Sequence, residues 1–257
     1  MTYFGKSDVG NVREANEDCF LIKEIAENAL LAVVCDGMGG LDSGDIASSL
    51  ASVSFSMTIE RLTKPFTKDG ILKLNDNEAF IILSNALTVA NNKVISKEEE
   101  INAIDGMGTT LVAALIIDGG KQISGIIIGD SRLYTVDSRD ILQVSKDHSY
   151  IQYMIDIGKL TLEESKKSKK KNLITKALGI EEECEPDIDT FTLRDEEVKD
   201  TSILLCSDGF SNSVSEEECS TIVKNKSMTA EEKVNTLIDL AKKNDGSDNI
   251  TLILVEL

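Results

Sequence analysis

The segment Leu31-Ala-Val-Val-Cys-Asp36-Gly37 places a short apolar run directly before an aspartate and a glycine. Such a run, bounded by a turn-forming residue, predicts a buried strand. A carboxylate at the end of a buried strand is held at the rim of the sheet. The adjacent glycine lets a backbone carbonyl or an oxygen-bound ion approach without a side-chain clash. The segment therefore predicts a sheet with a functional position at its edge.

The same pattern recurs elsewhere in the chain. Ile126-Ile-Ile-Gly129-Asp130 and Ile203-Leu-Leu-Cys-Ser-Asp208-Gly209 repeat it, and Asp248 stands just before the last predicted strand. Clustered aspartates raise one another's pKa unless a cation lies between them, and oxygen ligands without His or Cys select Mg²⁺ or Mn²⁺. Any single Asp-Gly can instead be only a turn. Four acids at strand ends, with Arg13 upstream, favour a metal site over that alternative.

A tight turn sets the pairing of two central strands. Thr109–Ile117 and Gln122–Ile128 are apolar and β-branched, and Asp118-Gly-Gly-Lys121 joins them. A two-residue Gly-Gly turn in this hairpin would place Asp130 opposite Thr109. The pattern therefore brings a third acid-bearing strand end beside the glycine-rich stretch that contains Thr109.

The C-terminal strands are expected to bring two further acids together. If Ile203–Cys206 pairs antiparallel with Ile250–Val255, the end of one strand lies beside the start of the other. Asp208 and Asp248 would then be neighbours. This pairing would add two carboxylates to one edge of a sheet.

The remaining periodicity predicts several helices and shorter strands. Apolar residues at Ile46, Leu50, Val53 and Met57 indicate a helix over 45–62, and spacings of 3 and 4 indicate another over Phe80–Val94. Residues 64–75 between them are expected to form a loop. Capping boxes predict helices that begin at Ser215-x-x-Glu218 and Thr229-x-x-Glu232. The other predicted strands are Thr2–Ser7, Cys19–Glu24, Leu133–Val136, Ile141–Val144 and Ile188–Leu193, and residues 149–182 are expected to be mostly helical.

Composition narrows the class of protein. The 257 residues include 27 Lys and Arg against 45 Asp and Glu, and a net charge of −18 argues against nonspecific nucleic-acid binding. The apolar runs are too short to span a bilayer, and the chain does not open with a signal peptide, so no membrane association is expected. Five scattered cysteines without a Cys-x-x-Cys pair indicate reduced thiols and a cytoplasmic protein. We expect one domain of mixed α/β class.

Eight short motifs follow one another along the chain. The motifs are Ser7-Asp-Val-Gly10 with Arg13, Asn16-Glu-Asp18, Asp36-Gly-Met-Gly-Gly40, Gly106-Met-Gly-Thr-Thr110, Gly129-Asp-Ser-Arg-Leu-Tyr134, Asp147-His-Ser149, Leu205-Cys-Ser-Asp-Gly209 and Asp248-Asn-Ile-Thr251. Taken together, they resemble those of the metal-dependent serine/threonine protein phosphatases of type 2C, and the compact form is most similar to small bacterial members. Each motif is weak alone, but their common order is specific, and the resemblance covers Ser7–Leu257.

The resemblance implies an α+β fold, an αββα sandwich of two antiparallel β-sheets with helices on both outer faces. It implies a single domain over residues 1–257, with a flap-like insertion at about 149–182. Bacterial relatives usually carry a His-Pro pair shortly before a segment like Asn172–Gly179, and here Ser168-Lys169 stands at that place. The departure concerns flap conformation and substrate choice rather than metal chemistry.

The resemblance also implies a metal centre with two Mn²⁺ or Mg²⁺ ions. Asp36 and a water or hydroxide would bridge the two ions, and the Gly37 carbonyl would help to hold one of them. Asp208 and Asp248 would hold the other ion. Asp130, together with Asp208, would hold a third and weaker ion.

The catalytic residues implied by the resemblance are Arg13, Asp18 and Glu17. Arg13 would grip the substrate phosphate with a bidentate fork that lysine cannot reproduce. Asp18 and Glu17 would hydrogen-bond metal-bound waters. His148, the only histidine, is expected to pack or to order a loop rather than to act as the general acid.

The implied function is hydrolysis of phosphoserine and phosphothreonine in proteins by a metal-activated water, opposing a bacterial Ser/Thr kinase. The expected partners are phosphoproteins and that kinase, and a monomer is expected. One alternative is an enzyme dedicated to one regulatory phosphoprotein, such as an anti-sigma-factor antagonist. Another is a non-catalytic phosphoprotein-binding pseudophosphatase. Loss of Asp36, Asp208 or Asp248 would favour the pseudophosphatase, and all three are present.

Overall fold

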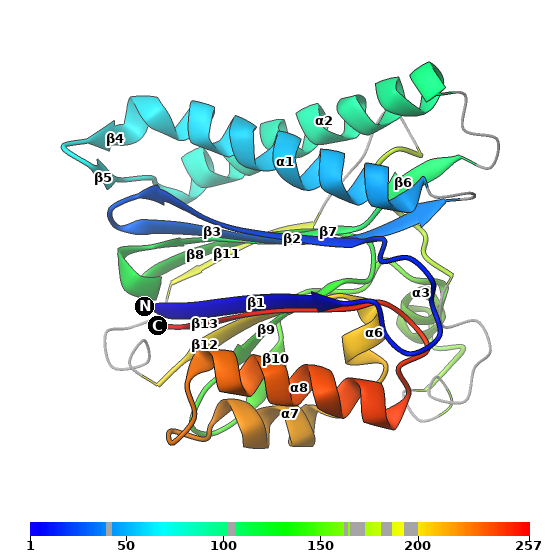
Figure 1. Ribbon diagram of the computed structural model, residues 1–257. Helices are drawn as coiled ribbons and strands as arrows, with labels where there is room; N and C mark the ends of the chain where they lie inside the picture. The colour runs from blue at the N-terminus through cyan, green and yellow to red at the C-terminus, as the bar shows by residue number, and fades with distance from the viewer. Residues whose placement is uncertain (40–42, 102–105, 162–163, 165–172, 181–186, 193–199) are drawn as a thin grey trace.

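The structure is a computed structural model that describes residues 1–39, 43–101, 106–161, 164, 173–180, 187–192 and 200–257. Across these residues, two large antiparallel sheets lie face to face between two layers of helices (Figure 1). The arrangement confirms the predicted αββα sandwich of the α+β class. The departure at Ser168-Lys169 lies outside the described residues.

The first sheet carries the segment Leu31–Gly37 on β3, the strand between β7 and β2. Its strands follow the order β11-β8-β7-β3-β2, and β6 extends it by pairing with β3. All pairs are antiparallel. The strands are β2 (Asp18–Ala26), β3 (Ala29–Gly39), β6 (Met107–Thr109), β7 (Leu111–Ile117), β8 (Gln122–Ile128) and β11 (Asp187–Thr192).

The second sheet is built largely from the C-terminal part of the chain. Its strands follow the order β1-β13-β12-β9-β10, again with antiparallel pairs. Thr2 pairs with Glu256, so the two ends of the chain lie side by side (Figure 1). The strands are β1 (Thr2–Asp8), β9 (Arg132–Val136), β10 (Ile141–Gln143), β12 (Ser202–Cys206) and β13 (Ile250–Glu256).

Two long helices cover the first sheet, and α7 and α8 cover the second (Figure 1). Both α7 and α8 begin with the predicted capping boxes, at Ser215 and Thr229. The helices are α1 (Gly44–Thr63), α2 (Asp76–Ile101), α3 (Tyr150–Asp156), α6 (Asp208–Ser211), α7 (Glu216–Val223) and α8 (Ala230–Asn244), with short 3₁₀ turns at Lys64–Phe66 and Asp118–Gly120.

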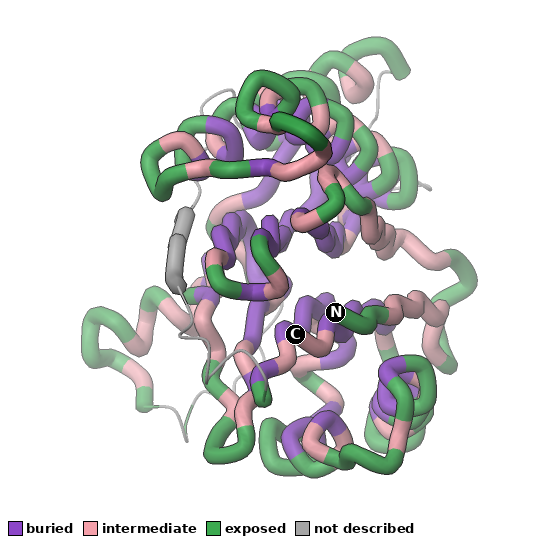
Figure 2. The backbone as a smooth tube through the Cα atoms, turned by 90° about the vertical axis from the view of Figure 1, so that its left-hand side faces the viewer, coloured by how far each residue is buried: buried purple, intermediate pink, exposed green. Residues whose placement is uncertain are grey.

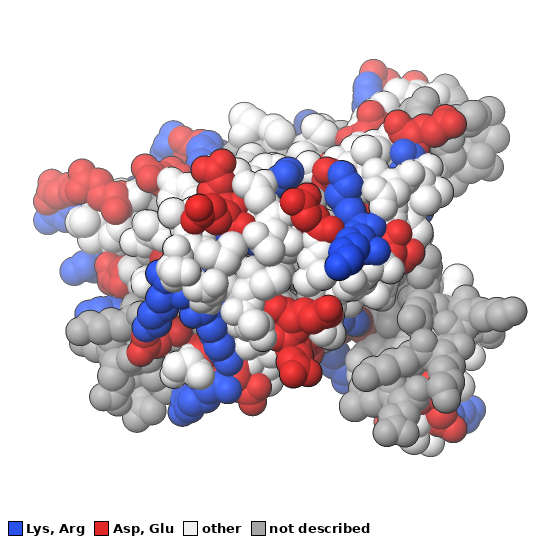
Figure 3. Space-filling view, turned by 60° about the horizontal axis from the view of Figure 1, so that its bottom comes forward, with Lys and Arg blue, Asp and Glu red and all other residues white. Residues whose placement is uncertain are grey.

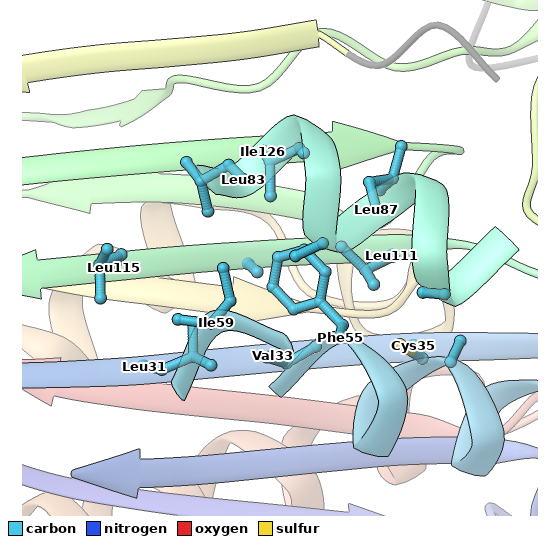
Figure 4. Close-up of a cluster of buried hydrophobic side chains, with 14 of the residues drawn as sticks. Leu31, Val33, Cys35, Phe55, Ile59, Leu83, Leu87, Leu111, Leu115 and Ile126 are labelled. Carbon is cyan, nitrogen blue, oxygen red and sulfur yellow. The ribbon is translucent and has the colours of Figure 1, made fainter. Parts of the chain in front are cut away.

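Apolar side chains fill the spaces between the layers. Phe55 and Ile59 of α1 pack with Leu83 of α2 against the first sheet (Figure 4). A second cluster, which includes Ala32 and Leu205, lies between the sheets, and a third lies under α7 and α8. Figure 2 shows buried positions in the middle of the molecule and along parts of the outer helices. Since β3, β8, β12 and β13 are buried over most of their length, their ends are held at fixed places on the sheet rims.

The predicted register of the central hairpin and the predicted pairing of the C-terminal strands are confirmed, but the expected position of Asp130 opposite Thr109 is not. The ladder ends at the pair of Leu111 and Ile128, because Thr109 belongs to β6 and pairs with Gly37 of β3 instead. Ile117 lies opposite Gln122 and Leu111 opposite Ile128, as the glycine turn requires. Gly119 and Gly120 both have positive φ angles, 67° and 98°, which glycine adopts without strain. Strands β12 and β13 pair antiparallel, as expected for the C-terminal acids.

Other features also differ from the sequence predictions. Residues 149–182 were expected to be mostly helical, but of the described residues there only Tyr150–Asp156 form a full helix, and Ile174 lies in a β-bridge with Ser149. The apolar positions expected along α1 face solvent: Val53 is 44% exposed and Met57 62%. Phe80 of α2 is likewise half exposed. Small residues instead allow α1 to approach the sheet and α2 closely, and the buried stripe is Ala47, Ala51, Phe55 and Ile59. The expected loop 64–75 contains a small hairpin of β4 (Thr67–Lys68) and β5 (Ile71–Leu72).

The side chain of Asn28 contacts the small hairpin in the manner of a strand partner. Its side-chain amide donates to the Leu72 carbonyl at 2.9 Å, and its side-chain oxygen accepts from the Leu72 N–H at 2.8 Å. A single side chain thus satisfies both backbone groups of Leu72. This contact joins residues 44 positions apart, so the local sequence pattern does not indicate it.

The surface carries charges of both signs. On the face that bears α7 and α8, acidic and basic side chains are interspersed (Figure 3). None of the helices in the described ranges is both long enough and apolar enough to cross a membrane.

Candidate metal centre

Five aspartates from both sheets meet at one end of the sandwich. Asp18 begins β2 and lies opposite Asp36 of β3, and Asp130 follows β8 of the same sheet. Asp208 follows β12, and Asp248 precedes β13 in the other sheet. Burial raises the pKa of Asp36 well above its usual value, and the charges of the four other aspartates raise it further. The structure therefore brings together every aspartate that the sequence singled out.

Backbone contacts fix Asp36 and Gly37. The Asp36 carbonyl accepts hydrogen bonds from the Thr109 hydroxyl and the Thr110 N–H, both at 2.9 Å. The Gly37 N–H donates to the Glu17 carbonyl at 3.1 Å. A Cβ atom on Gly37 would come within 2.1 Å of the Gly44 carbonyl oxygen, so a side chain has no room here. Only glycine therefore fits at position 37.

Asp18 carries one oxygen that lacks a protein partner. Its Oδ2 accepts a hydrogen bond from the Ser207 hydroxyl at 2.8 Å, while its Oδ1 is buried without a hydrogen-bond partner. Burial raises the pKa of Asp18 to about 7, and the charges of Asp208 and Asp248 act in the same direction. A buried, unpaired carboxylate oxygen is costly unless water or an ion contacts it.

Asp208 and Asp130 complete the acid cluster. Asp208 is the first residue of α6, and its carboxyl group hydrogen-bonds that of Asp36. Burial and the charge of Asp248 raise the pKa of Asp208. Asp130 is 8% exposed, and burial, followed by the charge of Asp208, raises its pKa to about 7. Two carboxyl groups within hydrogen-bond distance share a proton or a cation.

Arg13 lies at the exposed side of the cluster. Its Nη2 contacts both carboxylate oxygens of Asp248, at 3.0 and 3.1 Å, and half of its side chain is exposed. It is also close enough to Glu17 and Asp36 to interact with their charges. Arg13 is therefore the cation beside the acid cluster that the sequence predicted, and its guanidinium group reaches solvent.

Glu17 occupies a different position from the aspartates. Its carboxylate accepts a hydrogen bond from the backbone of Gly44 at the first residue of α1. An acidic group at a helix N-terminus is stabilised by the helix dipole. Its burial raises the pKa of Glu17, and the Gly44 contact opposes that rise. The expected contact between Glu17 and a water near the metals remains a prediction.

One supporting residue, Asn249, was not proposed as a site residue from the sequence. Asn249 accepts from the Glu17 N–H at 2.8 Å and donates to the carbonyls of Val9 and Ala15, both at 3.0 Å. It therefore holds the loop that carries Arg13 against the start of β13. The only signal for this role was its place beside Asp248, within a motif that the resemblance includes.

The acid cluster fits a divalent cation. Without one, the buried aspartates raise one another's pKa, and the buried oxygen of Asp18 has no partner. In the described part of the chain, no three Asp, Glu, His or Cys side chains are arranged to enclose an ion by themselves. Mg²⁺ and Mn²⁺ take oxygen ligands, and Mg²⁺ commonly retains several waters, so a donor set of carboxylates, a backbone carbonyl and water suits them.

Comparisons with known proteins agree with this chemistry. A family model described as "Protein phosphatase 2C" matches residues 11–244. The "Serine/threonine phosphatase stp" of Listeria monocytogenes is 34% identical over 251 residues, which cover 98% of this chain and 94% of that protein. The crystal structure of Stp1 from Staphylococcus aureus superimposes with a TM-score of 0.87 at 30% identity, covering 99% of this chain and 94% of that one.

A further solved structure contains metal. The catalytic domain of the serine/threonine protein phosphatase PstP, in complex with two manganese ions, has a TM-score of 0.79 at 30% identity. The match covers 98% of this chain and 96% of that one. Fold, site and relatives together define a protein-serine/threonine phosphatase. Within this class, the chain belongs to the protein phosphatase 2C family.

Proposed function

We propose that this phosphatase is metal-dependent and uses Mn²⁺ or Mg²⁺ at the aspartate cluster. The observation that carries the proposal is the convergence of five aspartates from two sheets beside Arg13. Asp36 and the Gly37 carbonyl would hold one ion, and Asp36 with Asp208 and Asp248 the other. The manganese-containing PstP structure supports a two-ion arrangement.

Asp130, together with Asp208, would hold a third and weaker ion. The support is that the two groups interact: the charge of Asp208 contributes to the raised pKa of Asp130. Asp130 is almost fully buried, so its carboxylate is held in place rather than free in solvent.

The chain's own residues would position the substrate. The Arg13 guanidinium would bind the phosphate of the substrate, because it lies beside the acid cluster and half of its side chain is open to solvent. Asp18 would accept a hydrogen bond at its unpaired Oδ1, and Glu17 would assist from the start of α1. When bound, the ions would supply an activated water and neutralise charge on the phosphoryl oxygens.

The proposed substrates are phosphoserine and phosphothreonine proteins, and the enzyme would oppose a Ser/Thr kinase in the bacterial cytoplasm. The names of the Listeria and Staphylococcus relatives support the substrate class. The described cysteines Cys19, Cys35, Cys206 and Cys219 are free thiols, which agrees with a reducing compartment.

The test is hydrolysis of p-nitrophenyl phosphate and of phosphothreonine peptides, with Mn²⁺ or Mg²⁺ and with excess EDTA. Activity should require the metal and return when the metal is restored. A phosphotyrosine peptide serves as the substrate control. Full activity in EDTA would refute the metal-dependent mechanism, while metal-dependent activity on p-nitrophenyl phosphate alone would refute the substrate class.

A further inference from the structure

The side chains of Asp147 and His148 contact residues on both sides of Asp130, and neither residue has a role in the proposed reaction. His148 is buried, and its Nδ1 accepts a hydrogen bond from the Gly129 N–H at 3.1 Å. The backbone N–H of His148 donates to the Gly129 carbonyl at 2.8 Å. Both polar backbone groups of the residue before Asp130 are therefore bonded to His148.

The turn at Gly129 depends on this support. Gly129 has a φ of 102°, and a Cβ at this position would lie 2.5 Å from the Thr110 side chain. Only glycine fits such a backbone. Since glycine is the most flexible residue, contacts from elsewhere must hold its conformation, and His148 supplies two of them.

Asp147 holds the other side of the turn. Arg132, two residues after Asp130, donates from Nε to Asp147 Oδ1 at 3.0 Å and from Nη2 to Oδ2 at 2.6 Å. The two side chains are 25% and 11% exposed, so this bidentate pair is largely shielded from water. Gln143 adds a hydrogen bond to Asp147 at 2.7 Å. Asp130 thus lies between two residues that the Asp147–His148 dipeptide holds.

The dipeptide also begins a two-stranded stem. The His148 carbonyl accepts from the Thr175 N–H at 2.8 Å, and the Tyr150 N–H donates to the Leu173 carbonyl at 2.7 Å. Ser149 and Ile174 form an antiparallel bridge between these two contacts. Residues 148–150 and 173–175, here called the stem, are thereby joined directly to the turn that carries Asp130.

We infer that Asp147 and His148 are positioning residues that fix Asp130 for its weaker metal ion and couple the occupancy of that ion to the stem. The inference rests on the proposed function, because it takes Asp130 as a metal ligand. Loss of the His148 acceptor would leave the Gly129 N–H unpaired and the Asp130 carboxylate less well fixed. Changes to residues that support metal ligands typically lower metal affinity about 10–100-fold.

The first test compares two substitutions in the full chain. His148→Leu removes the acceptor, whereas His148→Asn places a side-chain oxygen near the position of Nδ1. Titration calorimetry with Mg²⁺ should show that the affinity of the weak binding step is about 10–100-fold lower in the leucine variant than in wild type. The affinities of the tighter steps should be unchanged. The asparagine variant should retain most of the weak step. The inference would be overturned if the leucine variant bound Mg²⁺ with wild-type affinity in every step. It would also be overturned if both variants lost Mg²⁺ affinity equally in all steps.

Asp130→Asn separates this inference from the proposed function on which it rests. If Asp130→Asn leaves the weak step unchanged, Asp130 holds no ion, and that part of the proposed function fails. If Asp130→Asn removes the weak step while His148→Leu does not, only the positioning role fails. Combining the two substitutions should give no further loss of Mg²⁺ binding beyond that of Asp130→Asn, because both act on one site.

A second measurement needs no change at His148 and decides the matter if His148→Leu does not fold. His148 is the only histidine, so nitrogen NMR of the wild-type protein gives a single imidazole signal pair. Mg²⁺ is diamagnetic and leaves these signals observable. We expect them to shift during the weak binding step in wild type and to stay constant in Asp130→Asn. Imidazole signals that remain constant through the weak step in wild type would overturn the coupling.

Discussion

Replacing Asp208 with asparagine should stabilise the metal-free protein although it removes a proposed ligand. The charge of Asp208 contributes to the raised pKa of Asp18, Asp36 and Asp130. A carboxyl group whose pKa rises from 3.8 to about 7, as for Asp18, costs the folded state roughly 4 kcal/mol at pH 8. Burial is the larger cause and persists in the variant, so about 1–2 kcal/mol should be recovered, or roughly 2–8 °C in Tm.

Added metal should reverse the order of the two Tm values, so that wild type melts above Asp208→Asn. At 100 times its Kd, a ligand adds about 2.7 kcal/mol to the folded state, so wild type should gain roughly 5–11 °C in Mn²⁺ and Asp208→Asn much less. The assay is a thermal melt of both proteins at pH 8, in EDTA and in Mn²⁺, beside p-nitrophenyl phosphate hydrolysis. A variant that melts well below wild type in EDTA would show that the hydrogen bond of Asp208 with Asn212 outweighs the repulsion. Equal Mn²⁺ shifts would show that Asp208 is not a ligand.

Three further predictions concern pH, substrate binding and a buried ion pair. Because Asp18 and Asp130 have pKa values raised from 3.8 to about 7, the folded metal-free protein binds more protons than the unfolded chain in that range. Its Tm in EDTA should therefore fall between pH 5 and pH 8, and a Tm that rises steadily over this range would contradict the repulsive cluster. Arg13→Ala should raise the KM for a phosphothreonine peptide roughly ten- to hundred-fold while the variant still binds Mn²⁺, and an unaltered KM would make Arg13 a surface residue. Lys233 is 4% exposed and its Nζ lies 2.6 Å from Glu256, so Glu256→Gln should lower the free energy of unfolding by about 1–3 kcal/mol in a urea titration; no change would mean that water replaces the partner.

Strand pairing was predictable where a local turn set the register. Gly119 and Gly120 determine the alignment of β7 and β8, since the positive φ angles that the turn needs are available to glycine. Four of the site aspartates were predictable for a related reason: each lies at the end or start of an apolar run, and they are Asp36, Asp130, Asp208 and Asp248. Asp18 was indicated only by the resemblance to the family's motifs. By contrast, the prediction of which residues of α1 are buried was wrong. Helical spacing alone cannot show that Ala47 and Ala51, rather than the larger Val53, lie where the sheet approaches.

Contacts between distant residues were not predictable from local patterns. Asn249 holds Glu17 across 232 positions, and Ser207 bonds Asp18 across 189. Hydrogen bonds of this kind depend on the assembled sandwich, and an Asn or Ser in isolation is equally typical of a turn. The sequence therefore indicated the acids themselves but not the neutral side chains that orient them.

Because the aspartates are divided between the two sheets, catalysis requires the sheets to stay aligned with each other. Asp18, Asp36 and Asp130 move with one sheet, while Asp208 and Asp248 move with the other. A slip of one sheet past the other by a single residue, about 3.3 Å, would pull the two sets apart. The apolar layer between the sheets, which includes Ala32 and Leu205, therefore acts as the alignment surface of the enzyme. Substitutions that disturb the packing of that layer, far from the substrate phosphate, should therefore lower the affinity for metal well before the protein unfolds.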